Sequence, residues 1–281
     1  MQQIVTLIAA SGAEPTLRER VAALGAEADW LAPGACDVAG VEEAALRAAL
    51  ADAPVDIVYQ PAAGRRKRLL VADLESTIIE NEMLDELADF LGLRAPVAAI
   101  TRRAMNGEID FVAALAERVA LLRGQPAALL ERAAARIRLM PGARALVATL
   151  RRDGVPVALV SGGFTVFAER VAAELGIDRV VANRLELTDA KIAGTVAPPI
   201  VTGATKRETL LALAAEFGLA PRETLAVGDG ANDLPMLAAA GLGIAYRAKP
   251  AVAAASRWRI DHADLTALLY AQGYRAEQIA R

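Results

Sequence analysis

One short apolar segment constrains the fold of this chain more than any other feature. Leu69–Ala72 has the length and composition of a buried β-strand, and Asp73 follows it directly. Residues 80–150 then show only helical patterning, and short apolar segments separated by helical ones begin after Gly154. This alternation predicts a parallel sheet with helices on both faces. We therefore expect an α/β protein with a helical insertion after the first strand of its sheet.

The pattern also predicts where the elements of this larger part lie. A hairpin is expected over Arg184–Val196, with its turn at Thr188–Ala190, and a helix over Glu208–Phe217. The helices expected before Gly154 are Asn81–Leu91, Ala95–Met105, Phe111–Leu122, Pro126–Arg136 and Ala143–Arg152. The strands expected after it are Val155–Val160, Arg179–Val181, Thr224–Val227 and Leu242–Ala245.

Residues 1–67 are patterned as a separate small α+β unit. Ala28–Val41 has room for one or two strands, so the unit is expected to be a β-α-β-α-β sandwich resembling a small regulatory fold. Its other strands are expected at Ile4–Ala9 and Val55–Tyr59, and its helices at Thr16–Leu24 and Val41–Ala51. We expect two domains, 1–67 and 68–281.

Four consecutive cations end the segment that joins the two units, Pro61–Arg68. They are Arg65, Arg66, Lys67 and Arg68. One interpretation is a contact with a polyanion, and the other is a solvated linker. We expect the solvated linker, because clustered charge is common beside a domain joint.

Composition excludes several classes of function. The 281 residues carry a net charge of -3 and only 4% aromatic residues, so nucleic acid is not an expected partner. Cys36 and His262 are the only cysteine and histidine, which excludes an intrachain disulfide and a closed Cys/His zinc site. Met1–Ala13 lacks the basic start of a signal peptide, and no stretch reaches the ~20 apolar residues of a membrane span. We expect a cytoplasmic protein without a membrane partner.

The ends of the first two strands of the larger sheet carry reactive side chains. Asp73 and Glu75 follow the first strand, where a carboxylate can be a nucleophile, a metal ligand or a general acid/base. The alternative is an Asx-type turn. Ser161–Gly163 follows the next strand and offers a hydroxyl and open backbone amides to a phosphate. The alternative there is a helix cap.

Two later segments add a cation and a pair of carboxylates. Lys206 lies in the first turn of a helix, where a positive charge is unfavourable unless something negative is near. Otherwise it is a surface lysine balanced by Glu208. Asp229 and Asp233 are placed to share one ion, and Mg²⁺ favours such carboxylates. The alternative is an Asp/Asn/Gly turn.

Taken together, these groups suffice for transferring a phosphoryl group to a carboxylate. The P-loop signature G-x-x-x-x-G-K-[ST] is absent, which disfavours a Walker-type nucleotide enzyme.

The set resembles the haloacid dehalogenase superfamily of aspartate-nucleophile phosphatases, and over residues 69–270 it is most similar to the phosphoserine phosphatase family. The resemblance implies a Rossmann-like parallel-sheet core (68–79 and 146–281) with a helical cap (80–145). It also implies Mg²⁺-dependent hydrolysis of O-phospho-L-serine to L-serine and phosphate through an aspartyl-phosphate, the last step of serine biosynthesis. The segments that carry it are Asp73–Thr77, Asn81–Glu82, Ala104–Gly107 with Phe111, Ser161–Phe164, Ala182–Leu185 and Ala226–Asp233.

The resemblance also implies a role for each matching residue. Asp73 would be the nucleophile and Glu75 the general acid/base. Mg²⁺ would be held by Asp73, the carbonyl of Glu75, Asp229 and Asp233. Phosphate would be held by Ser161, Gly162, Lys206 and Asn232. The substrate would meet Glu82 through its ammonium and Arg118 through its carboxylate, with Met105 and Phe111 closing over it.

Glu75 departs from the family pattern, which has aspartate at that position. The extra methylene extends the reach of the carboxyl group by about 1.5 Å, and a misplacement of ~1 Å can cost ~100-fold in rate. Relatives that transfer phosphate to homoserine also carry glutamate there. The alternatives are therefore a phosphotransferase or phosphatase for another small phosphometabolite, and a non-catalytic amino-acid sensor. Residues 1–67 would bind an amino-acid effector or pair two chains as a homodimer.

Overall fold

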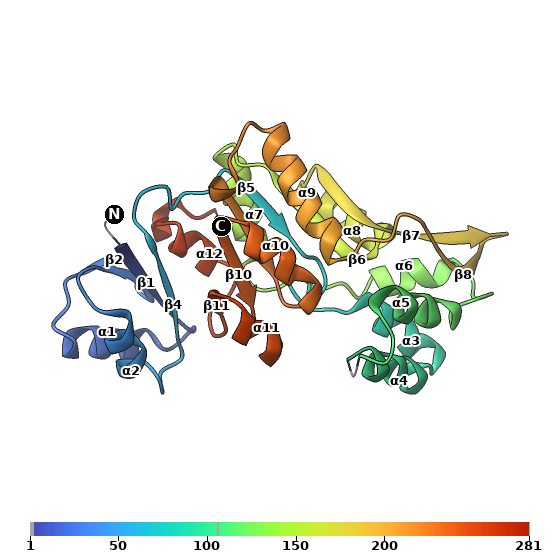
Figure 1. The fold of residues 1–281 in the computed structure, drawn as a ribbon, viewed down its shortest axis with the longest axis horizontal. Coiled ribbons are helices and arrows are strands. Elements are labelled where there is room, and N and C mark those ends of the chain that lie inside the picture. The colour runs from blue at the N-terminus through green and yellow to red at the C-terminus, as the bar shows by residue number, and fades with distance from the viewer. Residues whose placement is uncertain (1–2, 106, 281) are drawn as a thin grey trace.

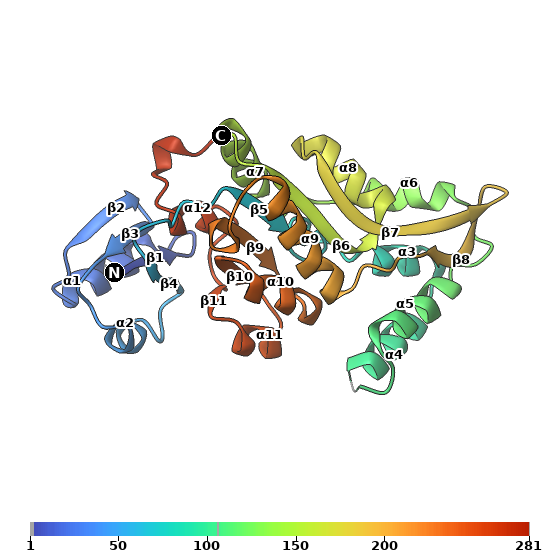
Figure 2. The ribbon, with the colours of Figure 1, turned by 45° about the horizontal axis from the view of Figure 1, so that its top comes forward.

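The computed structural model describes residues 3–105 and 107–280, except for the side chain of Met105. Its strands form two separate sheets. A four-stranded sheet with two helices lies at the left of Figure 1, and a seven-stranded sheet occupies the centre. The helical insertion that follows the first strand of the larger sheet lies at the right in both views (Figures 1 and 2). The expected α/β architecture with a helical insertion is confirmed.

The larger sheet has the strand order β11-β10-β9-β5-β6-β7-β8, and every pairing except β7–β8 is parallel. Its strands are β5 (Leu69–Ala72), β6 (Val157–Phe164), β7 (Arg179–Thr188), β8 (Lys191–Ala197), β9 (Thr224–Gly228), β10 (Leu242–Tyr246) and β11 (Trp258–Ile260). Read from β7 to β11, this is the doubly wound order 3-2-1-4-5-6. The order reverses direction between β5 and β9, and folds of this type bind ligands at that point.

Side-chain alternation along β5 explains why helices cover both faces of this sheet. Leu69 and Val71 belong to one buried cluster and Leu70 to the other, and all three have no exposed surface. Fully burying an apolar side chain of this size contributes roughly 1.5–3 kcal/mol. The first cluster includes residues of α9 (Gly203–Glu216), α10 (Leu234–Ala239) and α11 (Pro250–Ala255). The second includes residues of α7 (Ala143–Arg152), α8 (Thr165–Leu175) and α12 (Ala267–Ala271).

The helical insertion comprises four helices between β5 and α7, which we call the cap. They are α3 (Met83–Leu91), α4 (Arg94–Met105), α5 (Phe111–Ala120) and α6 (Ala128–Ala134). The expected hairpin is also present, because β7 pairs with β8 through Thr188 and Lys191. Asp189 and Ala190 form its turn with φ of 51° and 57°, as a two-residue turn of this hand requires. α5 packs against β8, so the hairpin joins the cap to the sheet.

Several elements differ from expectation, among them two near the expected site and one strand at the edge of the larger sheet. The helix that carries Lys206 begins at Gly203 and not at Glu208, because the Thr202 side chain accepts a hydrogen bond from the Thr205 backbone and caps it. β6 continues through the glycines to Phe164, with an irregular register after Ser161. The short edge strand β11 was not expected, since three residues with a central arginine give no strand pattern.

The smaller sheet is antiparallel, with the order β2-β3-β1-β4. Its elements are β1 (Gln3–Ala9), α1 (Glu14–Ala23), β2 (Ala28–Ala32), β3 (Ala35–Val38), α2 (Glu43–Ala49) and β4 (Val55–Pro61). The expected sandwich is confirmed, and its central segment contains two strands, which makes a βαββαβ unit. Leu7, Leu17 and Leu46 pack between the sheet and its helices with no exposed surface.

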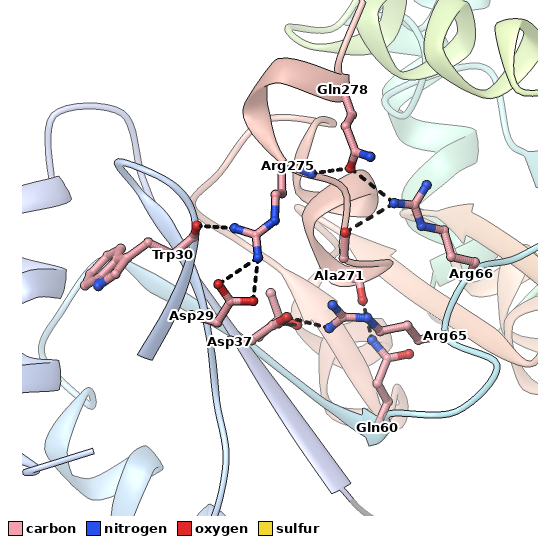
Figure 3. Close-up of polar contacts among 11 residues, drawn as sticks. Asp29, Trp30, Asp37, Gln60, Arg65, Arg66, Ala271, Arg275 and Gln278 are labelled. Atoms are coloured by element: carbon pink, nitrogen blue, oxygen red, sulfur yellow. Dashed lines mark hydrogen bonds and ion pairs between the residues drawn. The ribbon is translucent and has the colours of Figure 1, made fainter. Parts of the chain in front are cut away.

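The other face of the smaller sheet docks on the C-terminal part of the chain. Ile8 and Val58 belong to the same buried cluster as the core of the larger sheet. Polar side chains on this face are also buried and paired: Gln60 donates to the carbonyl of Ala271 at 2.5 Å. Nearby, Arg275 forms an ion pair with Asp29 at 2.7 Å (Figure 3).

The expectation of a solvated linker is wrong. Arg65 forms an ion pair with the buried Asp37 at 2.7 Å, and Arg66 donates to the carbonyl of Gly273 (Figure 3). Lys67 is 8% exposed and donates to two backbone carbonyls, and Arg68 pairs with Glu223 at 3.0 Å. Arg65 thus attaches this basic run to the N-terminal unit, and the other three cations attach it to the larger part of the chain. The run therefore connects the two units.

No helix in the described ranges is long and apolar enough to cross a membrane.

Candidate active site

The carboxyl ends of β5, β6, β9 and β10 border one cavity of about 700 Å³ beneath the cap. Nine residues singled out in the sequence line this cavity: Asp73, Glu75, Glu82, Phe111, Arg118, Ser161, Gly162, Asp229 and Asn232. Lys206 and Asp233 are fully buried and bonded to this group from within the core. Met105 ends α4, but its side chain lies outside the described part of the structure.

Asp73 is fixed at the centre of the site by the sheet and by a lysine. Its backbone N–H donates to the Val227 carbonyl at 3.0 Å, which continues the β5–β9 ladder. Lys206 Nζ lies 2.7 Å from Asp73 Oδ1 and 2.6 Å from Asp233 Oδ1. Burial alone would lower the pKa of Lys206, but these two carboxylates outweigh it and raise the pKa. They also offset the unfavourable position of a cation in the first turn of α9.

Asp73, Asp229 and Asp233 form a buried carboxylate cluster whose ligand atoms lie within 4.8 Å of one another. Burial, followed by the Asp233 charge, raises the pKa of Asp73 to about 7 and that of Asp229 to about 6. Lys206 supplies a single positive charge to three acidic groups. A divalent cation would relieve the remaining repulsion, and all-oxygen donors suit a hard ion. The cluster can therefore bind a metal.

The C-terminal end of β6 presents a hydroxyl and a bare backbone to the cavity. Ser161 Oγ accepts a hydrogen bond from the Gly163 N–H at 2.9 Å, which leaves its own proton free to donate. Asn183 Nδ2 holds the Gly162 carbonyl at 2.8 Å. A Cβ on Gly162 would lie 3.1 Å from the Phe111 ring, so a glycine lets this cap residue approach the end of β6 closely. Together these contacts form an anion-binding surface.

Glu75 extends its carboxyl group between the ends of β5 and β6. A Cβ on Gly163 would lie only 2.7 Å from Glu75 Oε1, so the longer side chain occupies space that a side chain at 163 would need. Oε1 also accepts a hydrogen bond from the Met83 N–H at 3.1 Å. Burial, followed by the Glu82 charge, raises the pKa of Glu75 to about 8. Burial therefore favours the protonated form of Glu75, which can donate a proton.

The cap contributes an acid, a base and an aromatic ring to the cavity. Glu82 precedes α3 and accepts a hydrogen bond from Ser76 Oγ at 2.8 Å. Arg118 lies on α5, and its Nε donates to the Ala114 carbonyl at 3.2 Å. Among the described residues the rest of its guanidinium has no hydrogen-bond partner, so it can bind an anion. Phe111 is the first residue of α5. The cap therefore presents both signs of charge opposite the carboxylate cluster.

Sequence reasoning did not single out Lys249, which also lines the cavity. Its backbone N–H donates to the Asp229 carbonyl at 3.4 Å, and its charge lowers the pKa of Asp229 against the larger effect of burial. A signal was available, because Lys249 follows the expected strand Leu242–Ala245. A lone lysine after a strand, however, carries no motif.

Comparisons with known proteins agree with this fold and site. Residues 67–241 match the model of the haloacid dehalogenase-like hydrolase family, and the chain belongs to that family. Phosphoserine phosphatase SerB2 of Mycobacterium tuberculosis is 40% identical over 96% of this chain and 70% of its own length. The phosphoserine phosphatase of Streptomyces coelicolor is 42% identical over 86% of this chain. Within the family, the chain therefore groups with the phosphoserine phosphatases.

The chain spans only 60% of the length of the Streptomyces coelicolor relative. A solved structure described as a phospho-aspartyl intermediate analogue of phosphoserine phosphatase superposes with a TM-score of 0.68 and 38% identity. It covers 73% of this chain and 98% of that one.

Proposed function

We propose that the protein is a Mg²⁺-dependent phosphatase that hydrolyses O-phospho-L-serine to L-serine and phosphate through an aspartyl-phosphate on Asp73. The ion pair between Asp73 and Lys206, at the end of the central strand and facing a capped cavity, is the observation that carries this proposal. The similarity to phosphoserine phosphatases supports the choice of substrate.

In the first step, an Asp73 oxygen attacks the phosphorus, and the bond from phosphorus to the serine oxygen breaks. Glu75 gives its proton to that oxygen, for which its raised pKa of about 8 is suited. Ser161, the Gly162 N–H, Lys206 and Asn232 bind the phosphoryl oxygens. When bound at the carboxylate cluster, Mg²⁺ supplies positive charge that reduces repulsion between nucleophile and phosphate.

In the second step, Glu75 removes a proton from a water molecule, which attacks the aspartyl-phosphate. The bond from phosphorus to Asp73 breaks, phosphate leaves, and Glu75 is again protonated. One carboxyl group therefore acts as acid and then as base. The cap excludes bulk water in the first step and admits one water in the second.

The cap residues match the other two charged groups of phosphoserine. Arg118 can grip the substrate carboxylate with parallel hydrogen bonds, and Glu82 can pair with the ammonium. Phe111, close to Gly162, would lie over the bound substrate, and Met105 is expected beside it.

The domain division expected from the sequence remains part of this proposal: 1–67, and 68–281 with a cap over 80–145. The separate sheets and the buried cluster beneath α1 and α2 support the first boundary. We propose that the N-terminal unit either binds an amino-acid effector or pairs two chains as a homodimer. Its βαββαβ fold supports the first role, and β2, which pairs on one side only within the described sheet, supports the second. Light scattering with and without L-serine tests both roles.

A Mg²⁺-dependent phosphate-release screen tests the activity. Phosphoserine should give the highest kcat/KM among phosphoserine, phosphothreonine and simple phosphomonoesters, and Asp73→Asn should abolish turnover because an amide is not a comparable nucleophile. Homoserine is added as a second acceptor. Formation of phosphohomoserine, or a null result with every ester, would contradict the proposal.

A further inference from the structure

A carboxylate of the N-terminal sheet is bound by backbone groups of the catalytic half of the chain. Asp56 on β4 is 4% exposed and accepts hydrogen bonds from three consecutive N–H groups that follow β11. The distances are 2.7 Å from Asp261, 3.2 Å from His262 and 2.8 Å from Ala263. Consecutive N–H groups that converge in this way form an anion-binding concavity. Asp56 therefore fixes the backbone of residues 261–263.

The segment held by Asp56 in turn holds Arg247. The Arg247 N–H donates to the Ile260 carbonyl at 2.8 Å, and its Nη2 donates to the Ala263 carbonyl at 3.3 Å. Arg247 has a φ of 43°, which is left-handed backbone in a residue other than glycine. Such a conformation costs roughly 1–2 kcal/mol and persists only where surrounding contacts impose it. The two hydrogen bonds to residues 260–263 are such contacts.

The turn that begins at Arg247 ends against the carboxylate cluster. Two residues on, the Lys249 N–H donates to the Asp229 carbonyl at 3.4 Å, and the Lys249 carbonyl accepts from Val252 and Ala253 at the start of α11. A continuous series of contacts thus runs from Asp56 through residues 261–263, Arg247 and Lys249 to Asp229.

We propose that Asp56 is a positioning residue for metal binding: by holding residues 261–263 it keeps Arg247 in its left-handed conformation, and so fixes the turn that braces Asp229. The inference rests on the proposed function, since it takes the carboxylate cluster as the Mg²⁺ site. According to this proposal, the N-terminal sheet helps to position a metal-binding residue whether or not an effector is bound.

The test is titration calorimetry of Mg²⁺ into the full-length protein without substrate. Asp56→Asn keeps the size of the side chain but puts an amide N–H₂ against N–H donors, and we expect about three- to tenfold weaker Mg²⁺ binding, the range usual for coupling through packed contacts. Arg247→Met, a change at an exposed side chain, should weaken binding to a similar extent. The double variant should bind no more weakly than either single variant, because both act in one series of contacts.

Asp29→Asn is the matched control. It removes the Asp29–Arg275 ion pair on the same docking face (Figure 3). Within the described part of the chain, the Arg275 side chain donates to Asp29 and to the Trp30 carbonyl and not to residues 247–263. Its melting temperature can fall, but its Mg²⁺ affinity should stay within about twofold of the wild type. If Asp56 only stabilised the fold, Asp56→Asn would leave the Mg²⁺ affinity unchanged, as we expect for Asp29→Asn.

Equal Mg²⁺ affinity in the wild type, Asp56→Asn and Arg247→Met would overturn this inference alone, and so would additive effects in the double variant. Wild-type protein that binds no Mg²⁺ would overturn the proposed cofactor together with it. If Asp56→Asn fails to fold, Arg247→Met decides the outcome.

Discussion

At the scale of single residues, the position of the Glu75 carboxyl group depends on the absence of a side chain at residue 163. The two groups compete for the same space, since a Cβ at 163 would lie 2.7 Å from Glu75 Oε1. An aspartate at position 75 would be shorter by about 1.5 Å and would vacate that space. Residues 75 and 163 are therefore coupled in packing.

This coupling predicts a non-additive pair of substitutions. Gly163→Ala should lower the free energy of unfolding by roughly 1–3 kcal/mol, the usual cost of overpacking a filled site. In the Glu75→Asp background the same change should cost at least ~1 kcal/mol less. Urea denaturation of the four proteins measures the difference. If Gly163→Ala costs the same, within ~0.5 kcal/mol, in the wild type and in Glu75→Asp, the two positions are independent.

The raised pKa of Glu75 predicts the pH dependence of kcat/KM. In the proposed mechanism, the first step needs Glu75 protonated and Asp73 ionised. At saturating Mg²⁺ the rate should therefore fall as pH rises past about 8, and fall again at a pH below about 7, because a bound cation lowers the pKa of Asp73 from its metal-free value of about 7. A Mg²⁺ concentration below saturation should move the acidic limb to higher pH.

Glu75→Gln separates the two limbs. It should lose the alkaline limb and about 10²–10⁴-fold in rate, the usual contribution of general acid/base catalysis. An alkaline limb that survives in this variant would assign that limb to another group.

At the scale of elements, the first strand of the larger sheet and the reactive side chains near its carboxyl edge were the most predictable parts of the protein. Leu69–Ala72 matches β5 residue for residue, because a charged residue flanks the apolar run on each side. The side chains expected at the ends of β5, β6 and β9 line one cavity, because parallel strands bring their carboxyl ends to the same edge of the sheet. Lys249 was missed because its position depends on the Arg247 turn, which no residue pattern marks.

The position of Arg118 on α5 predicts a loss of substrate discrimination. Arg118→Ala should raise KM for phosphoserine by roughly 10–100-fold, because hydrogen bonds to a charged group contribute about 1.5–3 kcal/mol. Phosphoethanolamine has the same phosphate and ammonium but no carboxylate, so its KM should change little. Steady-state kinetics with both esters decides the matter. A similar rise for both would mean that Arg118 does not bind the carboxylate.

At the scale of the whole molecule, the basic run Arg65–Arg68 joins regions that are distant in the sequence. Its partners include Asp37 in the N-terminal sheet and Glu223 in the larger part of the chain. Sequence patterns report on neighbours within a few turns, so they predicted the position of this joint but not its contacts. The buried polar face of the smaller sheet, with Asp56 and Gln60, was unforeseen for the same reason.

Two positions of this run should differ sharply in their effect on stability. Arg65→Met leaves the buried carboxylate of Asp37 without its cation and should cost roughly 3–5 kcal/mol in the free energy of unfolding. Arg68→Met removes an ion pair whose arginine is 63% exposed and should cost at most about 1 kcal/mol. Denaturant unfolding compares the two variants. A cost of at most about 1 kcal/mol for Arg65→Met, like that of Arg68→Met, would show that the Arg65–Asp37 pair does not hold the units together.

The long strand β7 has a mechanical consequence for the cap. Its first half pairs with β6 in the sheet, and its second half pairs with β8, against which α5 packs. The cap is thus connected to the sheet by β7 and β8 as well as by the chain segments at its two ends. At the point where β7 leaves β6, the Asn183 side chain donates to the Gly162 carbonyl and accepts from the Val201 N–H. In the proposed mechanism Ser161 and Gly162 bind the phosphoryl oxygens, so we expect a movement of the cap, transmitted through β7 and Asn183, to loosen the product as well.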